Sequence, residues 1–336
     1  MKTGPRNLIT DVAGLSVGNA HDAALRSGVT VLLPDAPALA AADIRGGGTG
    51  TRETHALELE GTVERIHGLA LSGGSAFGLD AATGVQAFLR ERGIGYAVGD
   101  ARVPIVPAAI LFDLLNGGNK DWGTFPPYRD LAYTACKSAA GEFGLGTAGA
   151  GYGATTANLK GGLGSASAVT AEGCTVGALA AVNAVGRVTV ADTPHFWAAP
   201  FEIGAEFGGR GPAPRLAPEA LELPLKGSRP RQATTLVVVA TDADISQVAL
   251  KRIAIMANAG LARAIYPAHS PLDGDIVLAL ATGQQKCAEA PDTLARLGQA
   301  AINVVARAVA RGVYEARAPE GAPAGPPAYK ELFGET

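Results

Sequence analysis

The sequence is poor in cysteine, in clustered charge and in long hydrophobic runs. Its three cysteines are odd in number and far apart, at positions 136, 174 and 287, which argues against a disulfide framework or a zinc site. The five histidines show no paired metal-ligand spacing, so we expect no metal. The formal net charge is only −3 and the basic residues form no run, which argues against nucleic acid or an anionic membrane as a partner.

No hydrophobic block is long enough to cross a membrane, and residues 1–7 are too polar for a secretory signal. Hydrophobic residues nevertheless make up 47% of the 336 positions, enough to bury a sizeable core. We therefore expect a soluble, cytoplasmic protein whose whole length, 1–336, forms a single domain.

Glycine is abundant, with 45 residues that follow no period of three, which is typical of tight turns rather than collagen. Apolar runs predict strands at 28–34, 67–71 and 276–281, and one or two strands within 174–190. Periodic patterns predict helices at 79–92, at 131–140, after a cap at Asp244 or Ser246, and from Pro291 onward. Residues 204–233 have no periodicity and predict a linker, and 317–336 predict a flexible tail.

Two glycine-rich segments resemble catalytic or cofactor motifs without matching their context. Residues 144–149 fit G-x-G-x-x-G but do not lie between a strand and a helix, so we expect no nucleotide cofactor. Residues 73–78 fall one position out of register with the G-x-S-x-G nucleophile motif. A tight loop at a helix N-terminus is the favoured interpretation there, and a hydrolase built on Ser75 with His195 or His269 as base is the alternative.

Thr234 opens the most apolar β-branched run of the chain, which predicts a strand buried on both faces. A threonine hydroxyl is a weak nucleophile, but the α-amine of an N-terminal threonine has a pKa of about 7.7–8.0 and can serve as its base. That amine exists only after the peptide bond between Ala233 and Thr234 is cut. A lysine, an amide and a carboxylate pair would complete such a site.

The chain resembles the self-processing L-aminopeptidase/D-esterases, a family that includes β-peptidyl aminopeptidases and nylon-oligomer (6-aminohexanoate oligomer) hydrolases. These are Ntn-type hydrolases related in fold to ornithine acetyltransferase. The resemblance covers nearly the whole chain. Its most specific parts are residues 71–79, 160–164 and 181–183, Thr234-Thr235, and 271–275.

The resemblance implies an α+β fold, a four-layer αββα sandwich, and self-cleavage into an α subunit, 1–233, and a β subunit, 234–336. The fragments would stay associated in a homo-oligomer, with a tetramer of αβ units suspected. Thr234 would be the nucleophile and Asn183 the oxyanion donor. The substrate would be peptide-like or an oligoamide, with no cofactor. The remaining roles fall to Lys160 as a charge, Asp273 and Asp275 as orienting acids, and Ser75, Phe112 and Thr235 as weaker substrate contacts.

Two positions depart from the family pattern. Relatives often have Tyr where this chain has Phe112, and those with a Thr nucleophile usually have Asn where it has Ala233. The Asp273-x-Asp275 pair resembles the nylon-hydrolase branch, whereas Lys160 followed by two glycines resembles the aminopeptidase branch, so the substrate stays open. An acyltransferase on the same fold and a non-catalytic small-molecule binding scaffold are the alternative functions.

Overall fold

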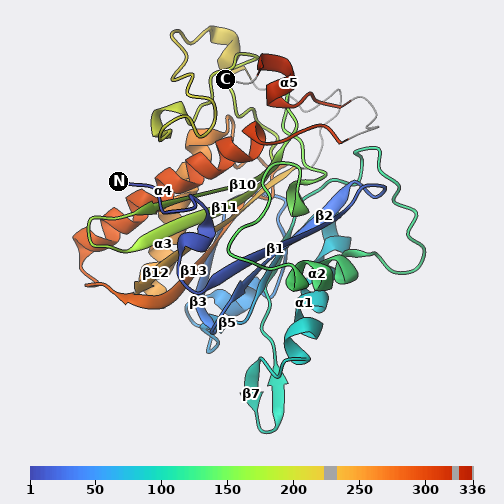
Figure 1. Ribbon diagram of the computed structural model, residues 1–336, viewed down its shortest axis with the longest axis vertical. Helices are drawn as coiled ribbons and strands as arrows, with labels where there is room; N and C mark the ends of the chain where they lie inside the picture. The colour runs from blue at the N-terminus through green and yellow to red at the C-terminus, as the bar shows by residue number, and fades with distance from the viewer. Residues whose placement is uncertain (223–232, 320–324, 335–336) are drawn as a thin grey trace.

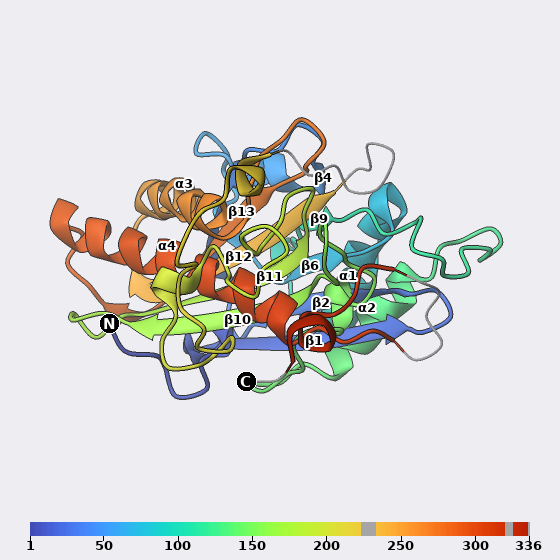
Figure 2. The ribbon, with the colours of Figure 1, turned by 90° about the horizontal axis from the view of Figure 1, so that it is seen from above.

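The computed structural model describes residues 1–222, 233–319 and 325–334. In this part of the chain, a five-stranded and a six-stranded β-sheet lie between two pairs of helices (Figure 1). Seen from above, the helix pairs stand on opposite sides of the sheets (Figure 2). The architecture confirms the expected α+β fold with four αββα layers.

The five-stranded sheet has the order β1-β2-β6-β9-β4. Helices α1 (Ala81–Arg90) and α2 (Tyr128–Lys137) cover its outer face, where Val29, Val31 and Ala70 share a core with Val85 and Ala132. Val29 and Val31 share this face because they are two residues apart on β2, and side chains alternate between the faces of a strand. The strands are β1 (Leu15–Asp22), β2 (Ser27–Pro34), β4 (Gly50–Arg52), β6 (Leu69–Ser72) and β9 (Ala108–Ile110).

The six-stranded sheet has the order β10-β11-β12-β13-β3-β5, with β12 and β13 parallel at its centre. Helices α3 (Gln247–Ala264) and α4 (Pro291–Tyr314) cover its outer face. A parallel pair of strands requires a crossover, and α3 supplies it. The strands are β3 (Ala38–Ile44), β5 (Arg65–Ile66), β10 (Gly162–Val169), β11 (Thr175–Asn183), β12 (Thr234–Asp244) and β13 (Ile276–Lys286).

Strand β12 is buried on both faces, as its sequence predicts. Leu236, Val238 and Ala240 point into the core between the two sheets, whereas Val237 and Val239 pack beneath α3 and α4. Because side chains alternate along a strand, Thr234 belongs to the inner face and Thr235 to the helix face. The central strand therefore delivers the side chain of Thr234 to the space between the sheets.

Most expected elements are confirmed, with shifted boundaries. The helix expected at 79–92 is preceded by a 3-10 helix, Ser75–Asp80, and the helix at 131–140 begins earlier, at Tyr128. Ser246 is the cap of α3, because its hydroxyl accepts a hydrogen bond from the Ala249 amide. The region 174–190 contains one strand, β11, which ends at Asn183. A hairpin of β7 (Tyr96–Val98) and β8 (Ala101–Val103) projects from the body (Figure 1).

The expected linker is only partly loose. Residues 204–222 contain one short 3-10 helix, Pro218–Leu221, and 223–232 lie outside the described residues. Phe207, however, is buried and packs edge-on against Phe196, with ring centroids 5.4 Å apart. Glu206 beside it is also anchored to the body. Single apolar or paired charged side chains can dock a segment that has no periodicity of its own.

The expectation of a flexible tail is wrong for residues 325–334. A short helix, α5 (Tyr329–Phe333), packs against the body, and the Tyr329 side chain is fully buried. Its ring stacks on Phe196 at 4.7 Å, and its hydroxyl donates to the carbonyl oxygen of Pro194 at 2.6 Å. One anchored aromatic residue therefore docks a proline-rich segment.

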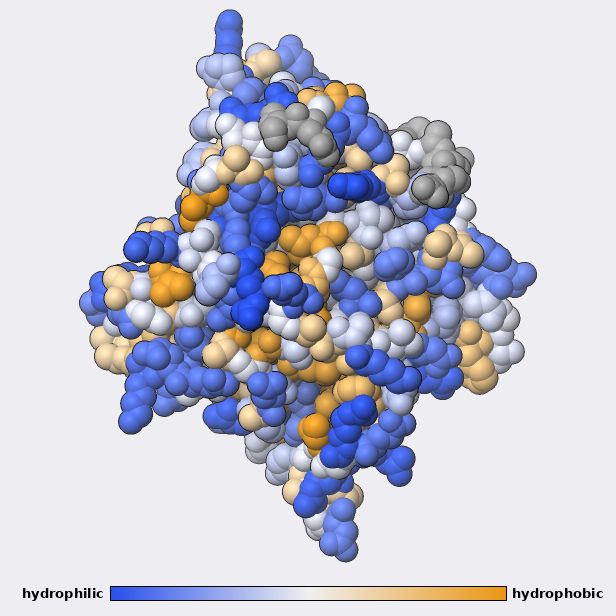
Figure 3. Space-filling model, viewed as in Figure 1, coloured by the Kyte–Doolittle hydropathy of each residue, from blue (hydrophilic) through white to orange (hydrophobic). Residues whose placement is uncertain are grey.

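The visible surface is mixed in character. Hydrophobic residues gather toward the middle of the face shown in Figure 3, with hydrophilic residues around them. None of the helices in the described ranges combines the length and hydropathy needed to cross a membrane.

Candidate active site

The predicted nucleophile and its predicted partners meet at one end of the six-stranded sheet. Thr234, the first residue of β12, pairs in register with Asn183, the last residue of β11. On the other side, Ala233 forms a parallel bridge with Asp273, which precedes β13. Neighbouring strands thus bring together residues separated by up to 90 positions (273 − 183).

The peptide bond before Thr234 is held in a fixed position. Thr234 is only 2% exposed, and its Oγ1 donates to the carbonyl oxygen of Ala233 at 2.5 Å. The Gly274 amide donates to the same oxygen at 2.9 Å, and the Ala233 amide donates to the Leu272 carbonyl at 3.1 Å. The segment before β13 therefore clamps Ala233 while the hydroxyl of Thr234 lies against its carbonyl group.

Asn183 joins the two sheets at this site. It lies on the inner face, like Ala181, and it is 1% exposed. Its Oδ1 accepts from the Thr155 amide at 3.0 Å, and its Nδ2 donates to the Phe112 carbonyl at 3.0 Å. Phe112 follows β9 of the opposite sheet. It contacts Asn183 through its backbone carbonyl oxygen.

The two acids flank Gly274 and bind backbone amides. Asp275 Oδ1 accepts from the Thr235 amide at 2.8 Å, and Asp273 Oδ1 accepts from the Val185 amide at 3.1 Å. Both are 1% exposed, and burial, followed by the charge of Asp275, raises the pKa of Asp273. Asp275 therefore holds the chain just after Thr234, and Asp273 holds the chain just after Asn183.

His269 is a neighbour of this pair that sequence reasoning considered only as a base for Ser75. Its backbone amide donates to Asp275 Oδ2 at 2.9 Å, and its ring Nδ1 lies 3.0 Å from the same oxygen. This side-chain hydrogen bond raises the pKa of His269. The sequence signal that could have placed His269 near Asp275 is the run of turn-forming residues between them, which brings the chain back on itself.

Lys160 lies two residues before β10 and is 6% exposed. Its Nζ donates to the carbonyl oxygens of Gly151 at 3.2 Å, Ala154 at 2.7 Å and Gly161 at 2.9 Å. Burial lowers the pKa of Lys160 to about 7, and the charge of Asp113 partly opposes this shift. A lysine with such a pKa can change its charge near neutral pH.

Asp113 is a buried acid that the sequence did not single out. It accepts from Ser27 Oγ at 2.6 Å and from the Gly74 amide at 2.7 Å, and burial raises its pKa. The Ser75 amide next to it donates to the Leu111 carbonyl at 3.0 Å. This part of the site is therefore built from the end of the five-stranded sheet.

The remaining candidates are arranged less directly around the nucleophile. The two histidines considered as a base for Ser75 are placed elsewhere, since His269 pairs with Asp275 and His195 Nδ1 lies 3.0 Å from the Gly211 carbonyl. Thr235 is fully buried on the helix face, and its Oγ1 has no hydrogen-bond partner within the described residues. No group of three His, Cys, Asp or Glu side chains in this part of the chain could hold a metal.

A cavity of about 210 Å³ adjoins the site. Lys160 and Thr155 form one side of it, and Thr155 is the residue that donates to Asn183. The segment after α4 supplies much of the remaining lining. The other lining residues are Arg26, Asn116, Tyr152, Gly153, Ala318, Pro319, Gly325, Pro326, Pro327 and Glu331.

Comparison with known proteins agrees with this geometry. Residues 7–324 match the model of peptidase family S58. A protein of Mycobacterium tuberculosis (strain ATCC 25618 / H37Rv) named as an uncharacterized aminopeptidase is 44% identical over 97% of this chain and 98% of its own length. A 6-aminohexanoate-oligomer endohydrolase of Kocuria sp. (strain KY2) is 28% identical over 84% of this chain and 77% of its own.

Two solved structures share the fold. The L-aminopeptidase D-Ala-esterase/amidase of Ochrobactrum anthropi, described as a variant of the Ntn hydrolase fold, has a TM-score of 0.71 and 24% identity over 98% of this chain and 93% of its own. A β-aminopeptidase of Burkholderia sp. has a TM-score of 0.69 and 23% identity over 99% and 94%. These likenesses establish an Ntn-type fold. With the family match, they show that the chain is a hydrolase acting on amide bonds and that it belongs to peptidase family S58.

Proposed function

We propose that this chain is a self-processing N-terminal-threonine hydrolase that acts through an acyl-enzyme on peptide-like amides. The observation that carries the proposal is the contact of the buried Thr234 hydroxyl with the carbonyl group of Ala233, at 2.5 Å between oxygens. Cleavage of that peptide bond would free the α-amine that the threonine needs as its base. The chain would then consist of fragments 1–233 and 234–336.

In turnover, the α-amine of Thr234 takes the proton of its own hydroxyl, and Oγ1 attacks the substrate carbonyl. Asp275 holds the backbone beside this amine through the Thr235 amide, and Asp273 holds the end of the neighbouring strand through the Val185 amide. Asn183 stands opposite Thr234 on the same face of the sheet, where an amide can donate to the developing oxyanion. Protonated Lys160 adds positive charge. The substrate carbon–nitrogen bond breaks as the α-amine of Thr234 passes its extra proton to the leaving amine, and water then hydrolyses the acyl-enzyme ester.

The cavity beside Lys160 is the proposed substrate site. Its volume of about 210 Å³ fits a short acyl group, and Arg26 and Glu331 provide both signs of charge at its wall. Relatives are named as an aminopeptidase and as a 6-aminohexanoate-oligomer endohydrolase. The two substrate types to compare are therefore a peptide-like amide with a free amino end and an unbranched oligoamide. Ser75 and Phe112 are proposed as more distant contacts.

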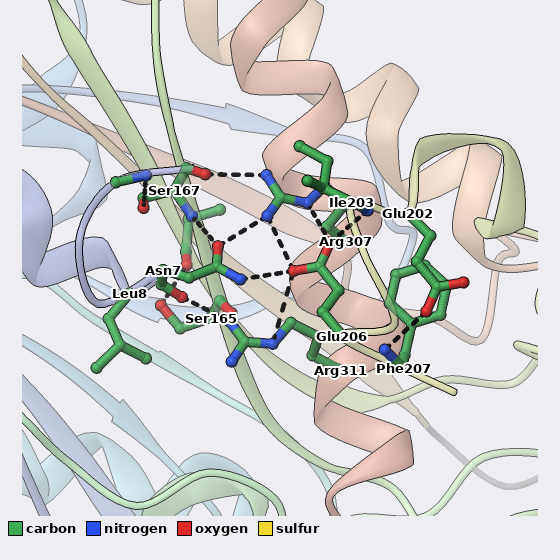
Figure 4. A network of polar contacts seen from close by, with 12 residues as sticks. Asn7, Leu8, Ser165, Ser167, Glu202, Ile203, Glu206, Phe207, Arg307 and Arg311 are labelled. Atoms are coloured by element: carbon green, nitrogen blue, oxygen red, sulfur yellow. Dashed lines mark hydrogen bonds and ion pairs between the residues drawn. The ribbon is translucent and has the colours of Figure 1, made fainter. Parts of the chain in front are cut away.

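The two fragments are proposed to remain associated after cleavage. Strands β11 and β12 would belong to different fragments and yet are neighbours in one sheet. A buried ionic network also joins them (Figure 4): Arg307 of α4 contacts Glu206 through Nε at 2.5 Å and Nη2 at 2.9 Å. Asn7 Nδ2 donates to the same carboxylate at 2.6 Å. We further propose a homo-oligomer, which the exposed apolar residues of the β7–β8 hairpin support.

A panel of three amides tests the catalytic part of the proposal. An aminoacyl amide, a β-peptide and a 6-aminohexanoate oligomer are incubated with the wild type, Thr234→Ser and Thr234→Ala, and the released acid is measured. We expect hydrolysis of at least one amide by the wild type, retained activity in Thr234→Ser and none in Thr234→Ala. Undiminished hydrolysis by Thr234→Ala would reject Thr234 as the nucleophile.

A further inference from the structure

The carbonyl oxygen of Ala233 accepts a hydrogen bond of the kind that would stabilise an oxyanion at the same atom. It accepts from the backbone amide of Gly274 at 2.9 Å, within the range expected of an oxyanion donor. We propose that this amide is the oxyanion donor of the self-cleavage step, an inference that rests on the proposed function. Gly274 would therefore be a catalytic residue of maturation that acts through its backbone alone.

The clamp holds both the amide and the carbonyl group of Ala233. Ala233 forms a parallel bridge with Asp273, and its own amide donates to the Leu272 carbonyl at 3.1 Å. The carbonyl group of Ala233 therefore stays oriented toward the Gly274 amide while the hydroxyl of Thr234 lies against it. Such preorganised donors lower the barrier because they need no reorientation as charge develops.

A glycine loop fixes the donor. The Gly48 amide donates to the Asp273 carbonyl at 2.8 Å, and the Gly46 amide donates to the Asp275 carbonyl at 3.1 Å, on either side of Gly274. A Cβ at Gly46 would lie 2.2 Å from the Asp275 nitrogen, so only glycine permits this approach. The loop 45–49 therefore fixes the backbone on both sides of Gly274, and with it the position of the Gly274 amide.

The chemistry balances with water as the only other reactant. Oγ1 of Thr234 forms a bond to the Ala233 carbonyl carbon, and the carbonyl oxygen takes up negative charge against the Gly274 amide. The carbon–nitrogen bond then breaks, and the proton lost by the hydroxyl ends on the Thr234 nitrogen. Water hydrolyses the resulting ester, leaving a carboxylate on Ala233 and a free amine and hydroxyl on Thr234.

The side chain at 274 must be absent for the nucleophile to fit. A Cβ at this position would lie 2.5 Å from Thr234 Oγ1 and 2.9 Å from the Gly48 carbonyl oxygen. Because the second contact is with backbone, the added methyl group would displace either the hydroxyl or the amide. The donor proposed for turnover is the side-chain amide of Asn183, which also donates to the Phe112 carbonyl, whereas the donor proposed for maturation is the backbone amide of Gly274.

The test compares Gly274→Ala with the matched control Gly144→Ala, which lies outside the loops that hold the scissile bond. A Cβ at Gly144 would meet its nearest atom, the Ala148 Cβ, at 3.8 Å, an ordinary contact. The cleavage rate of freshly made full-length chain is followed by denaturing mass spectrometry, and folding is checked by circular dichroism. We expect Gly274→Ala to cleave about 10²-fold or more slowly, and Gly144→Ala to cleave nearly as fast as the wild type.

Amide exchange of Gly274 in uncleaved Thr234→Ala gives a second measurement, which decides the matter if Gly274→Ala does not fold. The Gly274 amide should exchange slowly, because it is hydrogen-bonded in the precursor. A folded Gly274→Ala chain that cleaves at the wild-type rate, or a rapidly exchanging Gly274 amide, would overturn the inference. A wild-type chain that never cleaves would instead remove the proposed function itself.

Discussion

The backbone amide of Lys160 donates to the carbonyl oxygen of Pro327 at 2.8 Å. This bond ties a proposed active-site residue to the C-terminal segment, which also forms one wall of the adjoining cavity. The end of the chain is therefore a structural part of the site, although it follows the last long helix by more than ten residues.

Loss of the Tyr329 anchor should weaken substrate binding. Tyr329→Ala removes a fully buried ring that stacks on Phe196, and we expect it to destabilise the fold by about 3 kcal/mol and to raise KM more than it lowers kcat. Tyr329→Phe removes only the hydrogen bond to Pro194 and should cost about 1 kcal/mol. Unchanged KM in Tyr329→Ala would argue against a role of this segment in the substrate site.

Lys160 should make stability depend on pH in the alkaline range. Its pKa is about 7 in the folded chain and 10.5 in the unfolded chain, so between these values the unfolded state binds more protons. The free energy of unfolding therefore gains a positive contribution as pH rises from 7 to 10, and none below 7. We expect the slope in the uncleaved Thr234→Ala chain to exceed that of Thr234→Ala/Lys160→Met. Equal slopes in denaturant titrations would contradict a lysine whose pKa is lowered by burial.

The Arg307–Glu206 pair should be essential for stability. Glu206→Gln leaves the 1%-exposed Arg307 guanidinium without its carboxylate, and we expect a loss of about 3 kcal/mol in the uncleaved Thr234→Ala chain. Arg296→Gln on the same helix breaks contacts of a side chain that is 45% exposed and should destabilise the chain much less than Glu206→Gln. Similar losses in urea unfolding would show that burial of the pair does not matter.

The β7–β8 hairpin should take part in self-association. Tyr96, Val98 and Val103 on this projection are 53%, 59% and 46% exposed. Large apolar side chains that are exposed together mark a surface for protein–protein contact. We expect Val98→Glu to lower the molar mass measured by light scattering. Asp100→Lys, which changes charge in the turn without removing apolar surface, should leave the mass unaltered. A single-chain mass already in the wild type would exclude the homo-oligomer.

Local patterns were sufficient for the central part of the fold. The β-branched run after Thr234 predicted a doubly buried strand, and the spacing of apolar residues predicted α4, because both signals lie within one element. The residue types of the site, including Asn183 and the Asp273 and Asp275 pair, came from the chemistry of a threonine nucleophile together with a family resemblance.

Other features depend on contacts between distant segments. The contact of Asp113 with the Gly74 amide and that of His269 with Asp275 became visible only when the sheets and the turn before β13 were assembled. Tyr329 and Phe207 lie in proline- or glycine-rich segments, where composition favours a loose chain and a single docked ring is invisible in sequence. The clamp on Ala233 by Gly274 likewise depends on a parallel bridge that no local pattern indicates.

The most direct test of self-cleavage is the mass of the purified wild-type chain under denaturing conditions, compared with the mass of the Thr234→Ala variant. Self-cleavage before Thr234 predicts two species for the wild type, corresponding to residues 1–233 and 234–336, with one intact chain for the variant. A wild-type protein that hydrolyses amides while remaining a single intact chain would contradict it.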